Sequence, residues 1–367
     1  MKLPPEPVIA MLSRVLRGLL IAALPILMSG CNMVVLSPSG DIARQQGNLV
    51  IASTILMLLI IVPVMVLTAV FAWRYRASNN KAKYEPDWDH STGLELVIWS
   101  APLLIIIALG AMTWITTHTL DPFRPISRIS ATQPMQTDIK PLRVQAVALD
   151  WKWLFIYPDY GIATVNEMAA PVDRPIDIQI TSSTVMNAFY VPALAGMIYA
   201  MPAMETQLHA VINHPGTYEG MSSNYSGAGF SGMHFKFHGF SNVDFDAWIN
   251  KNRSSDQALT RELYQALEKP SQREAVRRYG KIDPTLYDAI VNLCVDRNKM
   301  CQRDMAAIDA KGGLGEAGIY NIGRLSYDKP RTRLSDIEQT RDYVLALCTV
   351  DRSGPARSPA LLPQMTP

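Results

Sequence analysis

The fold is decided by the stretch LVIASTILMLLIIVPVMVLTAVFAW, residues 49–73, which runs for 25 residues without a charged side chain. A second run, LVIWSAPLLIIIALGAMTWITT, residues 96–117, continues for 22 residues in the same way. About 20 apolar residues cross ~30 Å of hydrocarbon, because an α-helix rises ~1.5 Å per residue. The sequence therefore predicts two membrane-spanning helices joined by a short loop.

Charges on either side of these runs orient the hairpin. The connecting loop carries Arg74, Arg76, Lys81 and Lys83, whereas Arg44 is the only basic residue between residue 31 and the first run. Basic residues in short loops stay on the cytoplasmic side of a membrane. We therefore expect residue 31, and everything after about residue 118, to lie in the periplasm of a bacterium, with the hairpin in its inner membrane.

The first 30 residues have the features of a lipoprotein signal peptide. Arg14 and Arg17 precede a short apolar segment that ends in Ser29, Gly30 and Cys31. The segment is about as long as the core of a signal peptide and short for a membrane span. Small residues before a cysteine are what the cleaving peptidase requires, so Cys31 is predicted to carry a lipid that includes palmitate. The alternative is an ordinary buried cysteine.

The chain after the hairpin changes to short runs of alternating polarity. Examples are VQAVA at 144–148, IDIQI at 176–180 and LHAVI at 208–212, each separated by turn residues. This pattern predicts a β-sandwich over residues 121–245. Helical spacing returns in a predicted C-terminal extension at 246–352, and a proline-rich tail at 353–367 is expected to be disordered. The net charge of +2, without a basic stripe, gives no indication of nucleic-acid binding.

Four short segments resemble subunit II of the haem–copper oxidases, in the cytochrome bo-type ubiquinol oxidase branch. They are FAWRYRASN at 71–79, DWKW at 150–153, IATVNE at 162–167 and YSGAGFSGM at 225–233. The resemblance implies a transmembrane hairpin at 31–120, a cupredoxin-like Greek-key sandwich and a place in a proton-pumping respiratory complex that oxidises ubiquinol and reduces oxygen to water. It further implies that the haems and one copper belong to a catalytic subunit I, accompanied by subunits III and IV.

The copper-carrying branch of this family, which accepts electrons from cytochrome c, binds two copper ions through an upstream histidine and a C-x-E-x-C-x-x-x-H-x-x-M motif. Aligning that motif on Gly227 and Met233 places non-ligating residues at its other positions, namely Ser222, Asn224, Ser226 and Phe230, and Asn187 stands at the position of the upstream histidine. Met233 alone retains its ligand type. A thioether among neutral hydroxyls does not hold a copper pair. The sequence therefore predicts a subunit without a metal or other redox centre.

Other residues near this motif are given structural roles. His234 and His238 are interpreted as surface or rim histidines, and Tyr225 and Phe230 as core that fills the vacated metal cavity. The resemblance places Trp151 and Trp153 in the aromatic region near which electrons enter in the copper branch, and here packing against the catalytic subunit is the favoured interpretation.

Glu95 begins the second apolar run, where the resemblance places a carboxylate at the mouth of a proton channel of subunit I. A helix cap is the alternative, since Thr92 and Glu95 have capping-box spacing and an acid is favoured in a first helical turn. Cys294 and Cys301 are candidates for a disulfide in an oxidising compartment. Cys348 could pair with either, and the connectivity stays open.

Two other functions compete with a metal-free oxidase subunit. One is a copper-carrying subunit II of a cytochrome c oxidase, which the substituted ligand positions disfavour. The other is a periplasmic lipoprotein scaffold without a role in turnover.

Overall fold

The structure is a computed structural model that describes residues 33–79, 81–83, 87–135 and 139–309. The predicted signal peptide, Cys31, Cys348 and the tail at 353–367 lie outside these residues. The chain divides into two compact units. The first contains the chain up to Ile139 with the loops Val191–Gly196 and Ala210–His214, and the second contains the remainder.

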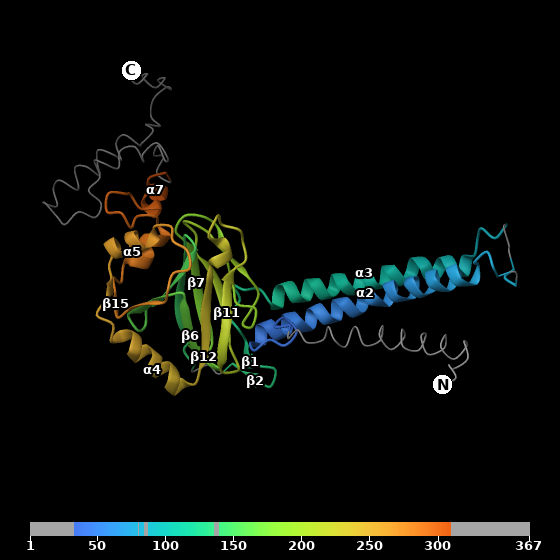
Figure 1. Ribbon diagram of the computed structural model, residues 1–367, viewed down its shortest axis with the longest axis horizontal. Helices are drawn as coiled ribbons and strands as arrows, with labels where there is room; N and C mark the ends of the chain where they lie inside the picture. The colour runs from blue at the N-terminus through green and yellow to red at the C-terminus, as the bar shows by residue number, and fades with distance from the viewer. Residues whose placement is uncertain (1–32, 80, 84–86, 136–138, 310–367) are drawn as a thin grey trace, which may run out of the picture. The chain divides into compact units, whose positions relative to one another are not determined.

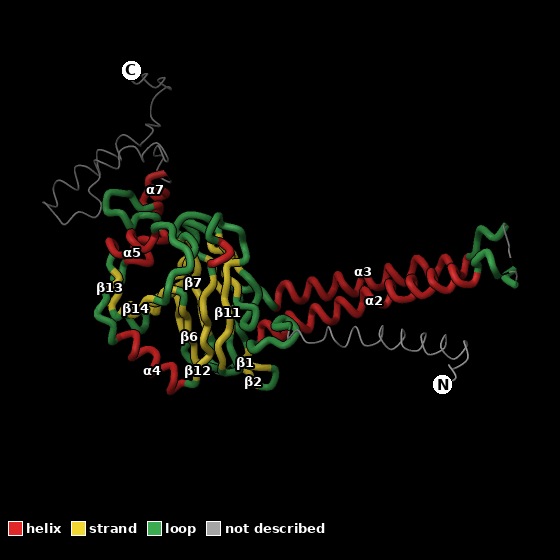
Figure 2. The backbone as a smooth tube through the Cα atoms, viewed as in Figure 1, coloured by secondary structure: helices red, strands yellow, loops and turns green. Residues whose placement is uncertain are grey.

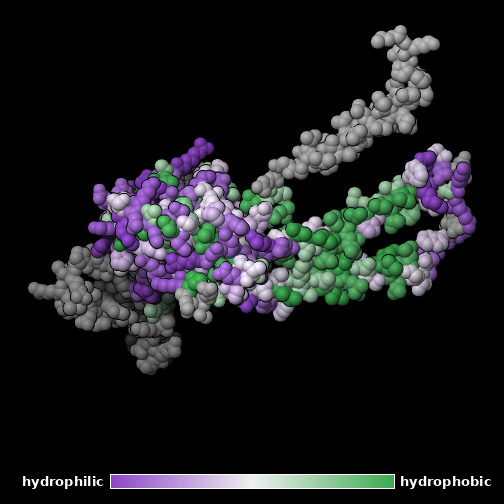
Figure 3. Space-filling model, turned by 90° about the horizontal axis from the view of Figure 1, so that it is seen from below, coloured by the Kyte–Doolittle hydropathy of each residue, from purple (hydrophilic) through white to green (hydrophobic). Residues whose placement is uncertain are grey.

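The first unit is dominated by two long helices, α2 (Asp41–Arg74) and α3 (Thr92–Thr119). Both are long and apolar enough to cross a membrane, and both contain the apolar runs predicted from the sequence. Hydrophobic residues cover the two arms in the space-filling view, and polar residues gather at the connecting loop (Figure 3). An apolar surface on every side is what a helix in hydrocarbon requires.

The helix α2 begins eight residues before the predicted span because its first turns are held by protein. Asp41, Ala43 and Gly47 are buried there. The guanidinium of Arg128 donates to both carboxylate oxygens of Asp41, at 2.8 and 3.2 Å. Arg128 belongs to the small β1 (Arg128–Ser130) and β2 (Gln133–Pro134) pair. This bidentate ion pair between Arg128 and Asp41 thus fixes the start of α2 to the segment that follows α3.

The second unit is a sandwich of two sheets (Figures 1 and 2). One sheet has the order β10-β7-β3-β4-β5-β14, with β3 (Leu142–Leu149), β4 (Lys152–Tyr157), β5 (Ile162–Val165), β7 (Ile176–Ser182), β10 (Thr206–Ala210) and β14 (Arg277–Tyr279). The other has the order β6-β12-β11-β8-β9, with β6 (Glu167–Pro171), β8 (Asn187–Tyr190), β9 (Ile198–Ala200), β11 (Gly216–Ser222) and β12 (His234–Phe240). The cupredoxin-like sandwich predicted from the sequence is confirmed.

An aromatic core joins the two sheets. Trp153 and Phe155 on β4 meet Phe189 on β8 and Phe235 on β12, with ring centroids 4.9 to 6.4 Å apart. All four side chains are at most 2% exposed. Such pairs add about 0.5–1.5 kcal/mol each beyond the area that they bury. The inner faces of the sandwich are therefore tied together by aromatic contacts between strands that are distant in sequence.

The C-terminal extension has the expected short helices, and it also contains three short strands. It contains α4 (Asn242–Arg253), α5 (Arg261–Glu268), α6 (Leu286–Val291) and α7 (Gln302–Asp309), together with β13 (Ala258–Leu259), β14 and β15 (Lys281–Ile282). Strand β14 pairs antiparallel with β5 and completes the six-stranded sheet. It is three residues long and begins with two arginines, so no alternation of apolar residues marks it in the sequence.

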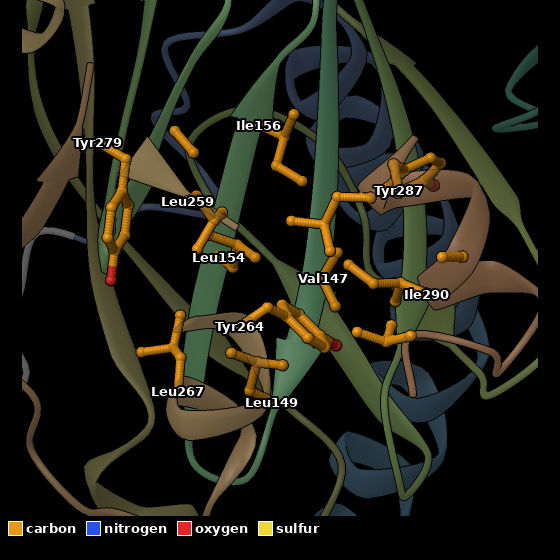
Figure 4. Packing of buried hydrophobic residues seen from close by; sticks show 14 of the residues in the cluster. Val147, Leu149, Leu154, Ile156, Leu259, Tyr264, Leu267, Tyr279, Tyr287 and Ile290 are labelled. Carbon is orange, nitrogen blue, oxygen red and sulfur yellow. The ribbon is translucent and has the colours of Figure 1, made fainter. Parts of the chain in front are cut away.

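The extension covers the outer face of the six-stranded sheet with a second hydrophobic core (Figure 4). Val147, Leu149 and Leu154 from the sheet pack with Tyr264 and Leu286 from the extension. Cys294, also in this core, forms a disulfide with Cys301, the pair suggested by the sequence. We name the described part of this extension that follows α4, residues 254–309, the cap.

Candidate functional site

Three of the six positions that the resemblance aligns with copper ligands meet at one end of the five-stranded sheet. Asn187 begins β8, Ser222 ends β11, and Met233 directly precedes β12. Strands β8 and β11 pair antiparallel, with Ser222 opposite Phe189. The exposed fractions of Asn187, Ser222 and Met233 are 1%, 4% and 1%. The sandwich therefore brings together three of the six positions in a buried place.

These residues satisfy one another through hydrogen bonds. The hydroxyl of Ser222 donates to Oδ1 of Asn187 over 3.1 Å, and the backbone N–H of Ser222 donates to the carbonyl of Met233 over 3.1 Å. The Asn187 amide in turn donates to the carbonyl of Val185 over 3.1 Å. We call Asn187, Ser222 and Met233 the polar triad. Asn187 and Ser222 are joined side chain to side chain, and Met233 is joined to Ser222 through its backbone carbonyl.

The loop between β11 and β12 carries the other three positions. The amide of Asn224 donates to the carbonyl of Met186 over 3.1 Å. The hydroxyl of Ser226 is buried without a hydrogen-bond partner among the described residues. Phe230 opens a short 3₁₀ turn, η2 (Phe230–Gly232), and is half-buried. The recorded contacts of Asn224, Ser226 and Phe230 do not bring these side chains together around a common point where a metal ion could bind.

The interpretation of Tyr225 as core filling is wrong, and Phe230 is half-buried. Tyr225 is 74% exposed, and its ring meets Phe230 edge-on at the surface. The space below the loop is taken by Trp151, whose indole N–H donates to the carbonyl of Ser226 over 3.0 Å. A Cβ at Gly229 would lie 2.3 Å from the indole, so only glycine fits there. The neighbouring indole displaces the loop's own aromatic residues outward.

The two tryptophans have different environments, which corrects their shared assignment as a subunit contact. Trp153 is fully buried in the aromatic core and presents no surface to a partner. Trp151 is partly exposed and stands in a turn with a left-handed φ of 66°. The break in strand geometry at Trp151 removes the alternation that would place both rings on one face. Of the two tryptophans, only Trp151 has an exposed surface.

The two histidines lie on strand β12, as predicted for surface or rim residues. Nδ1 of His234 lies 3.5 Å from Oε1 of Glu219, and Nε2 of His238 lies 3.5 Å from Oε1 of Glu167. Each histidine therefore faces its own carboxylate on a neighbouring strand. Because these acids are distant in sequence, the local motif gave no indication of them.

Glu167 is the centre of a charge cluster that sequence reasoning missed. Arg278 on β14 donates to its Oε2 over 2.7 Å. Burial alone would raise the pKa of Glu167, but the hydrogen bond with His238 and the charge of Arg278 outweigh it and lower that pKa. The cluster joins β6, β12 and the cap strand β14.

Lys152 is a second buried charge beside the cap. It is 1% exposed, and its ammonium donates to the carbonyl of Lys269 over 2.8 Å and to the hydroxyl of Ser271 over 2.7 Å. Burial lowers the pKa of Lys152, while the charge of Glu274 opposes that shift. A lysine in the DWKW segment is therefore a structural link between β4 and the cap.

The donor set of the site does not fit a dinuclear copper centre. Such a centre uses soft thiolates and imidazoles. The corresponding groups here are hydroxyls, amides, a phenyl ring and one thioether, and the Asn187 oxygen already accepts the Ser222 hydroxyl. Within the described part of the chain there is also no group of three His, Cys, Asp or Glu side chains that could hold a metal ion.

Glu95 lies in the first turn of α3 and is about half exposed. Its Oε1 is 2.6 Å from Nδ1 of His90, a residue that sequence reasoning missed although it precedes Glu95 by only five positions. Nε2 of His90 is 3.2 Å from the hydroxyl of Thr92. The capping box proposed for Thr92 is absent: the N-cap is Ser91, and no side chain caps the helix. The carboxylate is thus free to bond with the imidazole.

The fold and this site define a class, that of the membrane-anchored subunits II of haem–copper oxidases. A family model described as "Cytochrome C oxidase subunit II, periplasmic domain" matches residues 161–238. A second, "COX Aromatic Rich Motif", matches residues 253–298 and covers most of the cap.

Individual relatives narrow this class. The chain is 48% identical to "Cytochrome bo(3) ubiquinol oxidase subunit 2" of Pseudomonas putida over 267 residues, which is 73% of this chain and 82% of that protein. It is 45% identical to "Ubiquinol oxidase subunit 2" of Acetobacter aceti over 282 residues, 77% and 89% of the two chains. The periplasmic domain of subunit II of cytochrome oxidase from Bradyrhizobium japonicum is 24% identical, with a TM-score of 0.30, over 32% of this chain and 94% of that domain.

The chain belongs to the cytochrome bo3 ubiquinol oxidase subunit 2 family. It is thus a subunit of a ubiquinol oxidase, an oxidoreductase complex of the haem–copper terminal oxidase type, and a membrane protein with two apolar helices and a periplasmic domain.

Proposed function

We propose that this chain is a metal-free subunit II, which supports a quinol-oxidising, proton-pumping catalytic subunit without carrying electrons itself. The observation that carries the proposal is the polar triad, in which Ser222 donates to Asn187 at the place where copper ligands would stand. Without an entry copper, electrons must reach the haems and the single copper of the partner subunit I from a quinol dissolved in the membrane. Subunits III and IV complete the proposed assembly.

The test is a measurement on the purified complex. Copper is quantified per haem, and oxygen uptake is compared with ubiquinol and with reduced cytochrome c as donors. We expect only the copper of the catalytic subunit and activity with quinol alone. Extra copper with cytochrome c activity would favour a copper-carrying subunit II, and a chain that purifies without haem would favour a lipoprotein scaffold.

A second part of the proposal concerns proton entry at Glu95. The loop between α2 and α3 is cytoplasmic in the proposed orientation, so the carboxylate lies at the surface from which a pump takes its protons. His90 strengthens the case, because its imidazole, a group that can both donate and accept protons, stands 2.6 Å from Glu95. Together the two groups can collect protons and pass them to a water chain of subunit I.

The test uses two matched variants of the complex. Glu95→Gln should slow quinol oxidation and reduce protons pumped per electron, with subunit assembly unchanged. Glu219→Gln is the control, since Glu219 is also exposed and also faces a histidine, but on the periplasmic domain. Equal turnover and pumping in the two variants would contradict a proton role for Glu95.

The proposal also includes a lipid on Cys31 of the mature chain, after removal of residues 1–30, and anchoring in the inner membrane. Its domain organisation is a hairpin at 31–120, the sandwich at 121–245 and an extension at 246–352. The mass of the mature chain tests the lipid directly: a chain that begins at Cys31 with added diacylglycerol and fatty acid is expected.

A further inference from the structure

A pocket opens in the periplasmic unit where the cap meets the sandwich. Helix α5 contributes Tyr264 and Glu268, helix α6 contributes Ile290, and the loop after β7 contributes Ser183. The volume is about 420 Å³, which is the size of sites that hold small molecules and many times the ~30 Å³ of one water. The walls of the pocket therefore come together only when the cap packs on the sheet.

Two buried hydroxyl groups face this pocket. Tyr264 is 0% exposed and Ser183 is 9% exposed. Their hydroxyls lie beside each other, yet neither makes a hydrogen bond of ordinary geometry among the described residues. Each hydroxyl carries one hydrogen, so if one donated to the other, the second hydrogen would still have no acceptor. The pocket thus holds at least one buried donor that an oxygen atom of a ligand can satisfy.

One wall of the pocket is apolar. Ile290 and Val295 are buried members of the hydrophobic cluster under the cap, and Leu293 is an exposed neighbour that also lines the pocket. The ring of Tyr264 lies within the same cluster, with its hydroxyl on the side of Ile290 (Figure 4). A ligand that reaches the two hydroxyls therefore lays its other end against aliphatic side chains.

The charged groups of the pocket favour an anion. Lys299 is exposed and lines the pocket together with Glu268. Burial raises the pKa of the Glu268 carboxyl, against the charge of Lys299 and with the support of Asp150. A carboxyl with a raised pKa keeps its proton more readily, and in that form it donates a hydrogen bond. Asp296, also at the pocket, accepts the backbone N–H of Asn298 over 2.9 Å within its own turn.

The arrangement discriminates between classes of small molecule. A carboxylate supplies acceptor oxygens for the hydroxyls of Tyr264 and Ser183, and Lys299 balances its charge. A short aliphatic tail on the same molecule covers the apolar wall. An organic cation would be repelled by Lys299 and would offer the hydroxyls no acceptor, while a neutral alcohol would gain nothing from the ammonium.

We propose that this pocket is a binding site for a small aliphatic carboxylate dissolved in the periplasm. The ligand contacts α5, α6 and the loop after β7 at once, so its binding holds the cap to the sandwich. The site is separate from the polar triad, none of whose residues lines the pocket.

The test uses the intact oxidase complex in lipid nanodiscs, with trifluorobutanoate as the probe. This molecule is a short carboxylate whose methyl end carries fluorine, and fluorine NMR records the broadening of its signal on binding. Tyr264→Phe removes one donor from the pocket, and Lys299→Gln removes the positive charge. Lys269→Gln is the matched control, because Lys269 is an exposed lysine that does not line the pocket. Trifluorobutanol is the neutral control for the probe.

We expect several-fold weaker binding of trifluorobutanoate to Tyr264→Phe and to Lys299→Gln, and unchanged binding to Lys269→Gln. Trifluorobutanol should bind several-fold more weakly than the acid. Equal affinity in all variants would place the probe elsewhere on the complex and overturn the proposal. No broadening with the unsubstituted complex would also overturn it and leave the pocket to water, and equal binding of the alcohol would overturn the assignment to a carboxylate. Thermal unfolding of each variant is measured in parallel, and Lys299→Gln, at an exposed position, keeps the test decisive if Tyr264→Phe fails to fold.

Discussion

The polar triad and the cap are two regions of one periplasmic unit that are stabilised in different ways, the triad by hydrogen bonds and the cap by buried apolar area. At the triad, short polar side chains stand where metal ligands would be, and Asn187 and Ser222 satisfy each other. Under the cap, sixteen buried residues form a continuous apolar cluster with the outer face of the six-stranded sheet. The chemistry of ligand positions can change by substitution alone, because a hydrogen bond between small side chains needs no additional segment of polypeptide. Covering a sheet face requires added apolar area, and here it required an additional segment.

The largest effect is expected in the cap cluster. Leu286→Ala removes a side chain that is fully buried, so the free energy of unfolding should fall by about 2–5 kcal/mol. Urea titration of the solubilised full chain, followed by tryptophan fluorescence, measures this. Leu263→Ala in α5 is the control at 36% exposure, with an expected change within about 0.5 kcal/mol. Equal losses in the two variants would mean that the cap does not stabilise the sheet.

A smaller effect is expected at Glu167, whose carboxylate binds Arg278 of the cap. Glu167→Gln weakens the bonds to Arg278 and His238 and should cost about 1.5–3 kcal/mol at neutral pH. Because the pKa of Glu167 lies below its ordinary value of 4.5, its contribution is complete above that pH and is lost as the pH falls through the lowered value.

The pH dependence separates this cluster from a surface pair. Unfolding titrations between neutral and acidic pH should show a shallower acid limb for Glu167→Gln than for the unsubstituted chain. In Glu219→Gln the acid limb should stay as it was, since the Glu219 side chain is 56% exposed. If stability falls with acidification as steeply in Glu167→Gln as in the unsubstituted chain, the cluster around Glu167 does not stabilise the domain through its ionised carboxylate.

The polar triad should respond less, and non-additively. Asn187→Ala or Ser222→Ala alone should each cost about 1 kcal/mol, because each leaves a buried partner without its hydrogen bond. The double variant should cost less than the sum of the two. Purely additive losses would indicate that the two side chains do not interact, and Ser223→Ala on the exposed side of the loop serves as a neutral control.

The smallest effect is expected at Tyr264 under the cap. Its hydroxyl is buried beside that of Ser183 but makes no hydrogen bond of ordinary geometry among the described residues, so Tyr264→Phe should change stability by no more than about 0.5 kcal/mol. Tyr157→Phe is the matched contrast, since the Tyr157 hydroxyl donates to the carbonyl of Ala169 and accepts from its N–H. A loss of about 1–3 kcal/mol is expected there. The reverse order would show that the Tyr264 hydroxyl has a partner after all.

Sequence patterns predicted the hairpin and the sandwich well because both depend on local periodicity. The apolar runs at 49–73 and 96–117 lie within α2 and α3, and the alternating segments at 144–148 and 176–180 lie within β3 and β7. The cap strand β14 escaped prediction because three residues with two arginines show no alternation. Its place is determined by pairing with β5, which no local window contains.

The site was predictable in its residue types and less so in its packing. Alignment on Gly227 and Met233 identified six positions, and the structure brings Asn187, Ser222 and Met233 together. The outward turn of Tyr225 could not be read from the sequence, since it follows from the indole of Trp151 beneath the loop. Arg278, which binds Glu167, and Lys269, which binds Lys152, come from the cap, more than 100 residues away along the chain.

The pairing of β5 with β14 has a consequence for the order in which the domain can assemble after export. Glu167 and Arg278 are separated by 111 residues, yet they meet across this part of the sandwich. A chain delivered across the membrane from its N-terminal side exposes β5 long before β14 arrives. Contacts of such long range slow folding and leave strand edges open in the interval. The outer edge of β5 therefore stays without its strand partner until β14 has crossed the membrane.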